Sequence, residues 1–314
     1  MTAGSATTRG LTAAAAAYAL WGLIGPVGKV LLVHFDPLAL NAVRATLLAV
    51  VLWVAIGPTR RREAWGLLRQ KDVVAMALVG YGLSFSFTMW SLDRLDPVIV
   101  TVVFYSAPLW TAIFARRLLG ERVGVWFLPA ALALMVGAAV AVAGRGGWEA
   151  FLAADGIGVL HALGAAVTWA LYTVLLRRRN HAGRPELPLW PLMAASFLVA
   201  SAYFWLAALV VEGPPQLGGV PGEAWAWMAV HAAYPGVAAF ALFSQALRLA
   251  GAGPVNLLVG VELLGTVFFA WLLYGGAPDA VQWLGILVVV AAVTGYLWRA
   301  PEAEAPEPPQ AEAG

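Results

Sequence analysis

The chain has 314 residues, of which 61% are hydrophobic and only 11% are charged, whereas soluble globular proteins carry about 25% charged residues. A mean hydropathy of +0.80 indicates more apolar surface than one water-soluble core can bury, so lipid is the expected solvent for most of the chain. The absence of cysteine excludes disulfides, thiolate catalysis, zinc–thiolate sites and iron–sulfur clusters.

Ten apolar segments follow one another along the chain, each near the roughly 20 residues that a membrane-spanning helix needs. They cover 11–33, 38–57, 73–92, 97–118, 123–143, 156–176, 189–211, 224–247, 253–274 and 280–298. The first is too long for a cleaved signal peptide, and no A-x-A-like cleavage site follows it. The tail at 300–314 is rich in Pro, Glu and Ala, and we expect it to be disordered. The pattern predicts an all-α membrane protein with ten transmembrane helices.

The distribution of Lys and Arg predicts the orientation. The N-terminus, the loops 58–72, 116–122, 177–188 and 247–252, and the C-terminus together carry 15 cations. The opposite loops carry only Arg94 and Arg145, and two further cations, Lys29 and Arg44, lie within spans. Both termini are therefore predicted to be cytoplasmic, and the isoelectric point near 9.0 is explained without a nucleic-acid partner.

Two halves of the sequence resemble each other. Thr111, Phe114, Ala115, Leu118 and Gly120 recur 155 positions later as Thr266, Phe269, Ala270, Leu273 and Gly275, and Trp21 and Lys29 match Trp169 and Arg177 at an offset of 148. Five spans per half would place equivalent loops on opposite sides of the membrane, as the alternation of basic and uncharged loops suggests. We predict inverted five-helix repeats at 11–143 and 156–299, a cytoplasmic tail at 1–10 and a periplasmic linker at 144–155.

Several motifs resemble the EamA branch of the drug/metabolite transporter superfamily. They are A-Y-A-L-W-G from Ala17 to Gly22, Arg44 early in the second span, S-A-P-L-W-T-A-I-F-A-R-R-L-L-G-E from Ser106 to Glu121, and V-E-L-L-G-T-V-F-F-A-W-L-L-Y-G-G from Val261 to Gly276. The sequence departs from the family pattern at Leu263, often a proline, and at Gly276, which replaces a second acidic residue. The resemblance implies transport of a small metabolite, commonly export across the bacterial inner membrane.

Three charged residues lie within spans, where a central charge costs roughly 2.5–3.5 kcal/mol. Glu262 is the only acidic residue deep in a span, which favours a site for proton coupling or for a substrate amine; the alternative is a structural partner for Arg44. Arg44 is expected to bind a carboxylate or to bridge the first two spans. Lys29 is a secondary candidate that could instead reach the outer interface.

Helix breaks and aromatic residues complete the candidate site. Gly25 and Pro26 should open the first span, and Tyr234-Pro235-Gly236 and Pro108 should interrupt two later spans. The aromatic candidates for substrate binding are Trp21, Trp90, Tyr105, Trp169, Tyr172 and Tyr234, with belt or core packing as the alternative. Asn256 joins them as a polar candidate, with Asn41 and Gln245 as secondary ones. No histidine pair has metal-binding spacing, so we expect neither a metal nor a cofactor.

The leading interpretation is a secondary transporter, not an enzyme, in which spans 1, 3, 4, 6, 8 and 9 enclose a central cavity. The expected partners are an amino acid or related amphipathic solute, the lipid bilayer and protons. A lipid flippase of the same fold, or a membrane-embedded enzyme, is the alternative. The sequence leaves substrate, direction, coupling and the choice between monomer and homodimer open.

Overall fold

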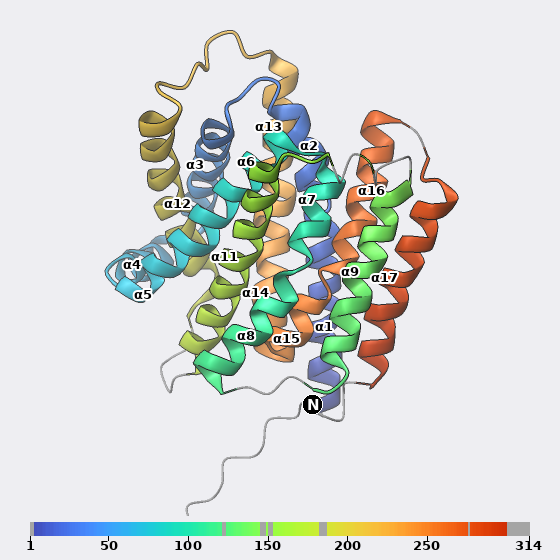
Figure 1. The fold of residues 1–314 in the computed structure, drawn as a ribbon. Helices are drawn as coiled ribbons and strands as arrows, with labels where there is room; N and C mark the ends of the chain where they lie inside the picture. Colours follow the sequence, from blue (N-terminus) through green and yellow to red (C-terminus); the bar gives the residue numbers. More distant parts are fainter. Residues whose placement is uncertain are drawn as a thin grey trace, which may run out of the picture.

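A computed structural model describes residues 3–120, 124–144, 149, 153–181, 187–275 and 277–299. All regular structure in these ranges is helical, and the helices form one bundle in which α1 begins and α17 ends at the same end (Figure 1). The helices of the first half are α1 (Ala3–Trp21), α2 (Ile24–Leu31), α3 (Pro37–Ala55), α4 (Pro58–Leu68), α5 (Lys71–Ala77), η1 (Leu78–Leu83), α6 (Ser84–Arg94), α7 (Pro97–Phe104), α8 (Ala107–Leu119) and α9 (Phe127–Ala143). Those of the second half are α11 (Gly156–His181), α12 (Leu189–Val211), α13 (Gly222–Ala233), η3 (Tyr234–Ala239), α14 (Phe240–Ala250), α15 (Ala252–Leu257), α16 (Gly260–Tyr274) and α17 (Ala280–Arg299).

Within the described ranges, nine helical stretches are long and apolar enough to cross a membrane. They are Ala6–Leu31, Pro37–Ala55, Lys71–Arg94, Pro97–Leu119, Gly156–Asn180, Leu189–Val211, Gly222–Ala250, Ala252–Tyr274 and Ala280–Trp298, and each overlaps one of the predicted segments. The predicted fifth segment corresponds to α9, a shorter apolar helix. Counting α9, we number these stretches spans 1 to 10. Large apolar side chains such as Val210 and Leu272 point out of the bundle, 76% and 68% exposed, as lipid contact requires.

Five of the described spans are interrupted, each near a proline or a glycine. Span 1 breaks at Gly22 and Leu23, between α1 and α2. Pro26 lies four residues after Gly22, and a proline ring clashes with the carbonyl four residues before it. Spans 3 and 8 each contain a π-helical turn, η1 and η3, and η3 includes Pro235. Spans 4 and 9 break after Phe104 and after Leu257. The predicted interruptions of spans 1, 4 and 8 are therefore present.

The described helices pack in a regular pattern. Span 1 packs against span 8 through α1 and α14, and span 3 packs against span 6 through α6 and α11. Span 1 also contacts span 9, and span 4 contacts span 6, while α3 lies along α12 and α9 along α17. Glycines allow two of these close approaches: Gly22 meets the backbone of Gly265, and Gly137 meets that of Gly285. The glycine faces of α9 and α17 are thus used within one chain.

The segment 58–72 differs from the prediction of a plain basic loop, because it folds into the short helix α4 and the start of α5. Pro58 begins α4, where the missing N–H of proline is no loss. Arg61 donates from Nε to the carbonyl oxygens of Trp53 and Ile56, at 2.6 and 3.1 Å. These carbonyls lie at the C-terminal end of α3, where cations are favourable, so the basic residues also anchor α4 to that end.

Candidate functional site

A central cavity lies among α1, α2, α6, α7, α11 and α16, with an empty volume of about 620 Å³ that includes its open mouth. Its polar lining comes from Ser84, Thr88, Thr101 and Glu262. Tyr18, Trp21, Phe85, Phe104 and Trp169 supply aromatic walls. Gly25, Leu92 and Pro97 also line it, and because Leu92 and Pro97 flank the α6–α7 connection, the cavity extends towards that end of the bundle. A mostly apolar and aromatic lining with a few polar groups is typical of small-molecule sites.

Trp21 and Trp169 pack against each other in the cavity lining as an edge-to-face pair, with ring centroids 5.2 Å apart and planes at 90°. Trp21 Nε1 donates to the carbonyl of Pro235 in η3 at 3.0 Å. The irregular hydrogen bonding of a π-helical turn leaves such a carbonyl available. The indole N–H of Trp169 is also buried, and it interacts with the Tyr18 hydroxyl. Trp169 is therefore oriented by another side chain of the cavity lining.

Glu262 lies in the first turn of α16, immediately after the break between α15 and α16. The N-terminal end of a helix carries a partial positive charge, which favours a carboxylate there. The side chain is half-buried and faces the cavity, and among the described residues no ion pair joins it to a cation. The alternative in which Glu262 pairs with Arg44 is therefore not what the structure shows. An acid in an aromatic-walled cavity can bind a proton or an amine.

Arg44 lines a second, smaller cavity, whose empty space of about 210 Å³ includes its open mouth. Its guanidinium carbon lies 4.5 Å from the centroid of the Phe85 ring. Asn41 lines the same cavity and donates from Nδ2 to the Phe85 carbonyl at 3.0 Å. Phe85 also lines the central cavity, so its side chain stands between Arg44 and the chamber that contains Glu262.

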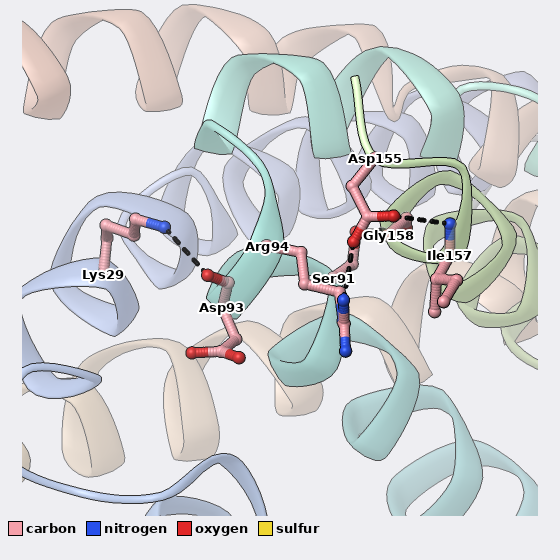
Figure 2. A network of polar contacts seen from close by, with 7 residues as sticks. All are labelled: Lys29, Ser91, Asp93, Arg94, Asp155, Ile157 and Gly158. Carbon is pink, nitrogen blue, oxygen red and sulfur yellow. Dashed lines mark hydrogen bonds and ion pairs between the residues drawn. The ribbon is translucent and has the colours of Figure 1, made fainter. Parts of the chain in front are cut away.

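A polar network ties three helices together at the end of the bundle where α6 ends (Figure 2). Lys29 Nζ donates to the carbonyl of Leu92 at 2.6 Å and also reaches those of Asp93 and Leu95. Arg94 pairs with Asp155 at 2.6 Å, and Asp155 accepts from the backbone N–H of Ile157 at 3.0 Å. These hydrogen bonds, that from Arg94 first, lower the pKa of Asp155. We call this network the α6 clasp.

A similar contact lies at the opposite end of the bundle. Arg177, near the end of α11, donates to the carbonyl of Leu247 near the end of α14 at 3.4 Å. Lys29 and Arg177 are 148 positions apart, and Leu92 and Leu247 are 155 apart. In both places a cation from one span caps the C-terminal carbonyls of another span, a position at which positive charge is stabilising. We call the second contact the α14 clasp.

The structure brings some of the predicted site residues together in the central cavity and places others elsewhere. Four of them line the central cavity: Trp21, Gly25, Trp169 and Glu262. Several others lie outside its lining. Tyr105, Tyr172 and Asn256 are buried behind it, and Asn256 accepts from Tyr18 at 3.2 Å while Tyr172 donates to Tyr81 at 3.2 Å. Trp90 packs against His161 with centroids 5.4 Å apart, Tyr234 is 45% exposed, and Gln245 is exposed.

Comparison with known proteins agrees with this architecture. A family model described as the EamA-like transporter family matches residues 8–143 and, separately, residues 156–298. The chain belongs to the EamA-like transporter family. This confirms the resemblance carried by the sequence motifs, and it makes the chain a multi-pass membrane protein of a family that transports small solutes.

Two individual proteins are similar to this EamA-like chain. "Uncharacterized transporter YvbV" of Bacillus subtilis (strain 168) is 29% identical over 164 residues, which are 51% of this chain and 50% of that protein. The match thus spans about half the length of that curated relative. A solved structure, "Crystal structure of protein", superposes with a TM-score of 0.73 at 20% identity and covers 96% of this chain and 99% of that one. At this identity the second likeness shows the fold alone.

Sequence reasoning missed several cavity-lining residues of this EamA-like protein. Tyr18 is three residues before Trp21, so the two share a helix face, and that spacing could have identified it. Phe85 carried no such signal, because its place between two cavities depends on how span 3 packs against span 2. Thr88 lines the cavity although its hydroxyl donates to the Ser84 carbonyl of its own helix at 2.8 Å, and such a bond gives no sequence signal for a cavity.

Proposed function

We propose that the chain is a secondary transporter that exports an amino acid or related amphipathic solute across the bacterial inner membrane. The observation that carries this proposal is the central cavity itself, in which one carboxylate, that of Glu262, lies among aromatic walls. A carboxylate attracts an amine, and aromatic faces attract both cations and apolar side chains. Glu262 would bind the solute amine and a proton in turn, which would couple export to proton entry.

Alternating access is the mechanism that we propose for this cavity. The family model matches the chain twice, in two parts of similar length. If spans 1 to 5 correspond to spans 6 to 10, then span 1 corresponds to span 6 and span 8 corresponds to span 3. The contact between spans 1 and 8 then has a counterpart between spans 6 and 3, and both contacts are present. The same exchange relates the α6 clasp to the α14 clasp. These correspondences support two inverted five-helix halves that open the cavity at one end and then at the other.

The basic segments support an orientation with both termini in the cytoplasm. The α14 clasp then lies at the cytoplasmic end and the α6 clasp at the periplasmic end. The first would hold the chain shut towards the cytoplasm, and the second would hold it shut towards the periplasm. Since both are made of a few polar contacts on helix ends, either can separate without disturbing the apolar contacts of the bundle.

The test is uptake of a labelled amino-acid panel into proteoliposomes, with and without a pH gradient. Wild type should show saturable uptake that responds to the gradient, and Glu262→Gln should lose that response. Glu223→Gln is the matched control, because Glu223 is exposed at the start of α13, outside the cavity lining. Gradient-independent uptake that is equal in wild type and Glu262→Gln would reject the coupling role, and absence of uptake for every amino acid would reject the solute class. Translocation of labelled lipid instead would favour a flippase.

A further inference from the structure

Arg44 is a buried cation without a protein counter-ion in the described part of the chain. It is 3% exposed, and its Nε and Nη2 atoms have no hydrogen-bond partner. Placing an ion away from water costs several kcal/mol unless it is paired. The cation–π contact with Phe85 contributes about 2 kcal/mol at a desolvated site, which leaves much of that cost uncompensated. The arrangement therefore lacks an anion.

The orphaned donors have a specific geometry. Nε and Nη2 lie on the same edge of the planar guanidinium, and their two N–H bonds are parallel. This edge binds a carboxylate through two parallel hydrogen bonds, a pairing that Lys cannot reproduce. A phosphate with its larger charge would call for a second cation, and the described lining of this second cavity contains no cation besides Arg44.

Phe85 separates this second cavity from the central one. Its ring covers the guanidinium on one side and lines the Glu262 chamber on the other. The π-helical turn η1 ends two residues before Phe85, and such turns mark places where a helix changes hydrogen-bond register, frequently at functional sites. Rotation of the Phe85 side chain would join the two cavities and uncover the unpaired edge of Arg44.

We propose that the second cavity binds the carboxylate of the transported solute and that Phe85 is a displaceable partition in front of it. Without solute the ring covers Arg44; with solute the ring moves aside and the carboxylate takes its place, forming two charge-assisted hydrogen bonds. This inference rests on the proposed function, in which Glu262 binds the amine. It makes the solute a zwitterion, with its two charged groups held in two adjoining cavities.

The test compares binding of phenylalanine, phenethylamine and 3-phenylpropionate to the purified full-length protein by isothermal titration calorimetry. These probes carry both charged groups, the amine alone and the carboxylate alone. Hydrogen bonds to a charged group contribute about 1.5–3 kcal/mol, so wild type should bind phenylalanine roughly tenfold to a hundredfold more tightly than phenethylamine. Arg44→Lys should reduce this ratio to near one while phenethylamine binding persists.

A second variant tests the cavity without removing the charge. Ala200 lines the second cavity and is fully buried, so Ala200→Leu fills the space that the carboxylate would take. Ala202→Leu is its control, since Ala202 is on the same helix and exposed. Ala200→Leu should lower the phenylalanine preference, and Ala202→Leu should keep it. Equal binding of phenylalanine and phenethylamine by wild type would overturn the carboxylate site at Arg44 but leave the proposed function intact. Binding of none of the three probes would overturn both the carboxylate site and the proposed amino-acid class.

Discussion

The crossing of span 1 and span 9 allows a quantitative test of the packing that positions Trp21 and Glu262. A Cβ atom added at Gly22 would lie 2.5 Å from Gly265 Cα and 2.6 Å from the Thr266 nitrogen, whereas ordinary contacts begin at 3.4 Å. Gly22→Ala must therefore push the two backbones about 0.9 Å apart. Overpacking costs typically 1–3 kcal/mol, and backbone obstacles favour the upper end of that range. At roughly 2 °C per kcal/mol for a chain of this size, the melting temperature should fall by about 6 °C.

The assay is thermal unfolding of the detergent-purified protein, monitored together with its ligand binding. Gly295→Ala is the control, because Gly295 lies in α17 with no atom within 4 Å of an added Cβ. That variant should be neutral or slightly stabilising, since alanine favours a helix over glycine by up to about 1 kcal/mol. The two variants should therefore move the melting temperature in opposite directions. A Gly22→Ala protein that unfolds with the wild-type profile and binds solute equally well would refute the argument that this crossing has no spare room.

Three further predictions concern the helix ends. Lys29→Met removes the cap of α6, which lies at the periplasmic end in the proposed orientation. It should speed labelling of a cysteine placed at Thr88 by a membrane-impermeant maleimide added from that side, and the cysteine-free wild type is the blank. Glu212 accepts hydrogen bonds from two backbone N–H groups at the start of α3, at 2.8 and 3.1 Å. Glu212→Ala should therefore destabilise the protein by about 1–2 kcal/mol in thermal unfolding. An unchanged melting temperature would reject the role of Glu212 as a helix cap. The pKa of Asp155 is lowered from its ordinary 3.8 by Arg94, so the contribution of this pair is present above that value and lost as pH falls through the lowered one. The rate of maleimide labelling at the Thr88 cysteine, divided by the rate for free cysteine at the same pH to remove the titration of the thiol itself, should thus be constant between about pH 8 and 5. A change of this ratio within that range would contradict the assignment.

Hydropathy was sufficient to place nine of the ten predicted segments on described helices that can cross a membrane, because lipid imposes a length and a composition that few other structures share. Breaks were predictable for the same kind of reason: a proline inside a span removes a donor and collides with the preceding turn. Pro26 shows the limit of that reasoning, since it identified the opening but not its place at Gly22. The α4 helix was missed because a charged, polar stretch has no apolar period, and its position depends on Arg61 meeting the exposed end of α3.

The candidate site was predictable where a residue type alone demanded an explanation. A glutamate deep in a span required one, and Glu262 does line the cavity. Aromatic residues did not, because Trp and Tyr serve equally as packing, as belt and as binding surface. Trp21 and Tyr234 were equal candidates by type, yet one lies in the cavity wall and the other is 45% exposed. Only the rotation of each helix about its axis decides between these outcomes, and that rotation depends on contacts far apart in sequence.

The two halves share a packing scheme but not their chemistry. Trp21 contacts Trp169 and Phe85 contacts Phe240, with centroids 5.2 and 6.1 Å apart, and these partners are separated by 148 and 155 positions. The position 155 residues before Glu262 is Ala107, so the acid has no counterpart. Under the proposed alternating access, paired aromatic residues would exchange roles when the bundle opens at the other end, because each packs against its own equivalent. A single carboxylate has no equivalent to exchange with, so in this proposal the halves would move around it. The repeated residues would then supply the motion, and the unrepeated ones, Glu262 and Arg44, would select the solute.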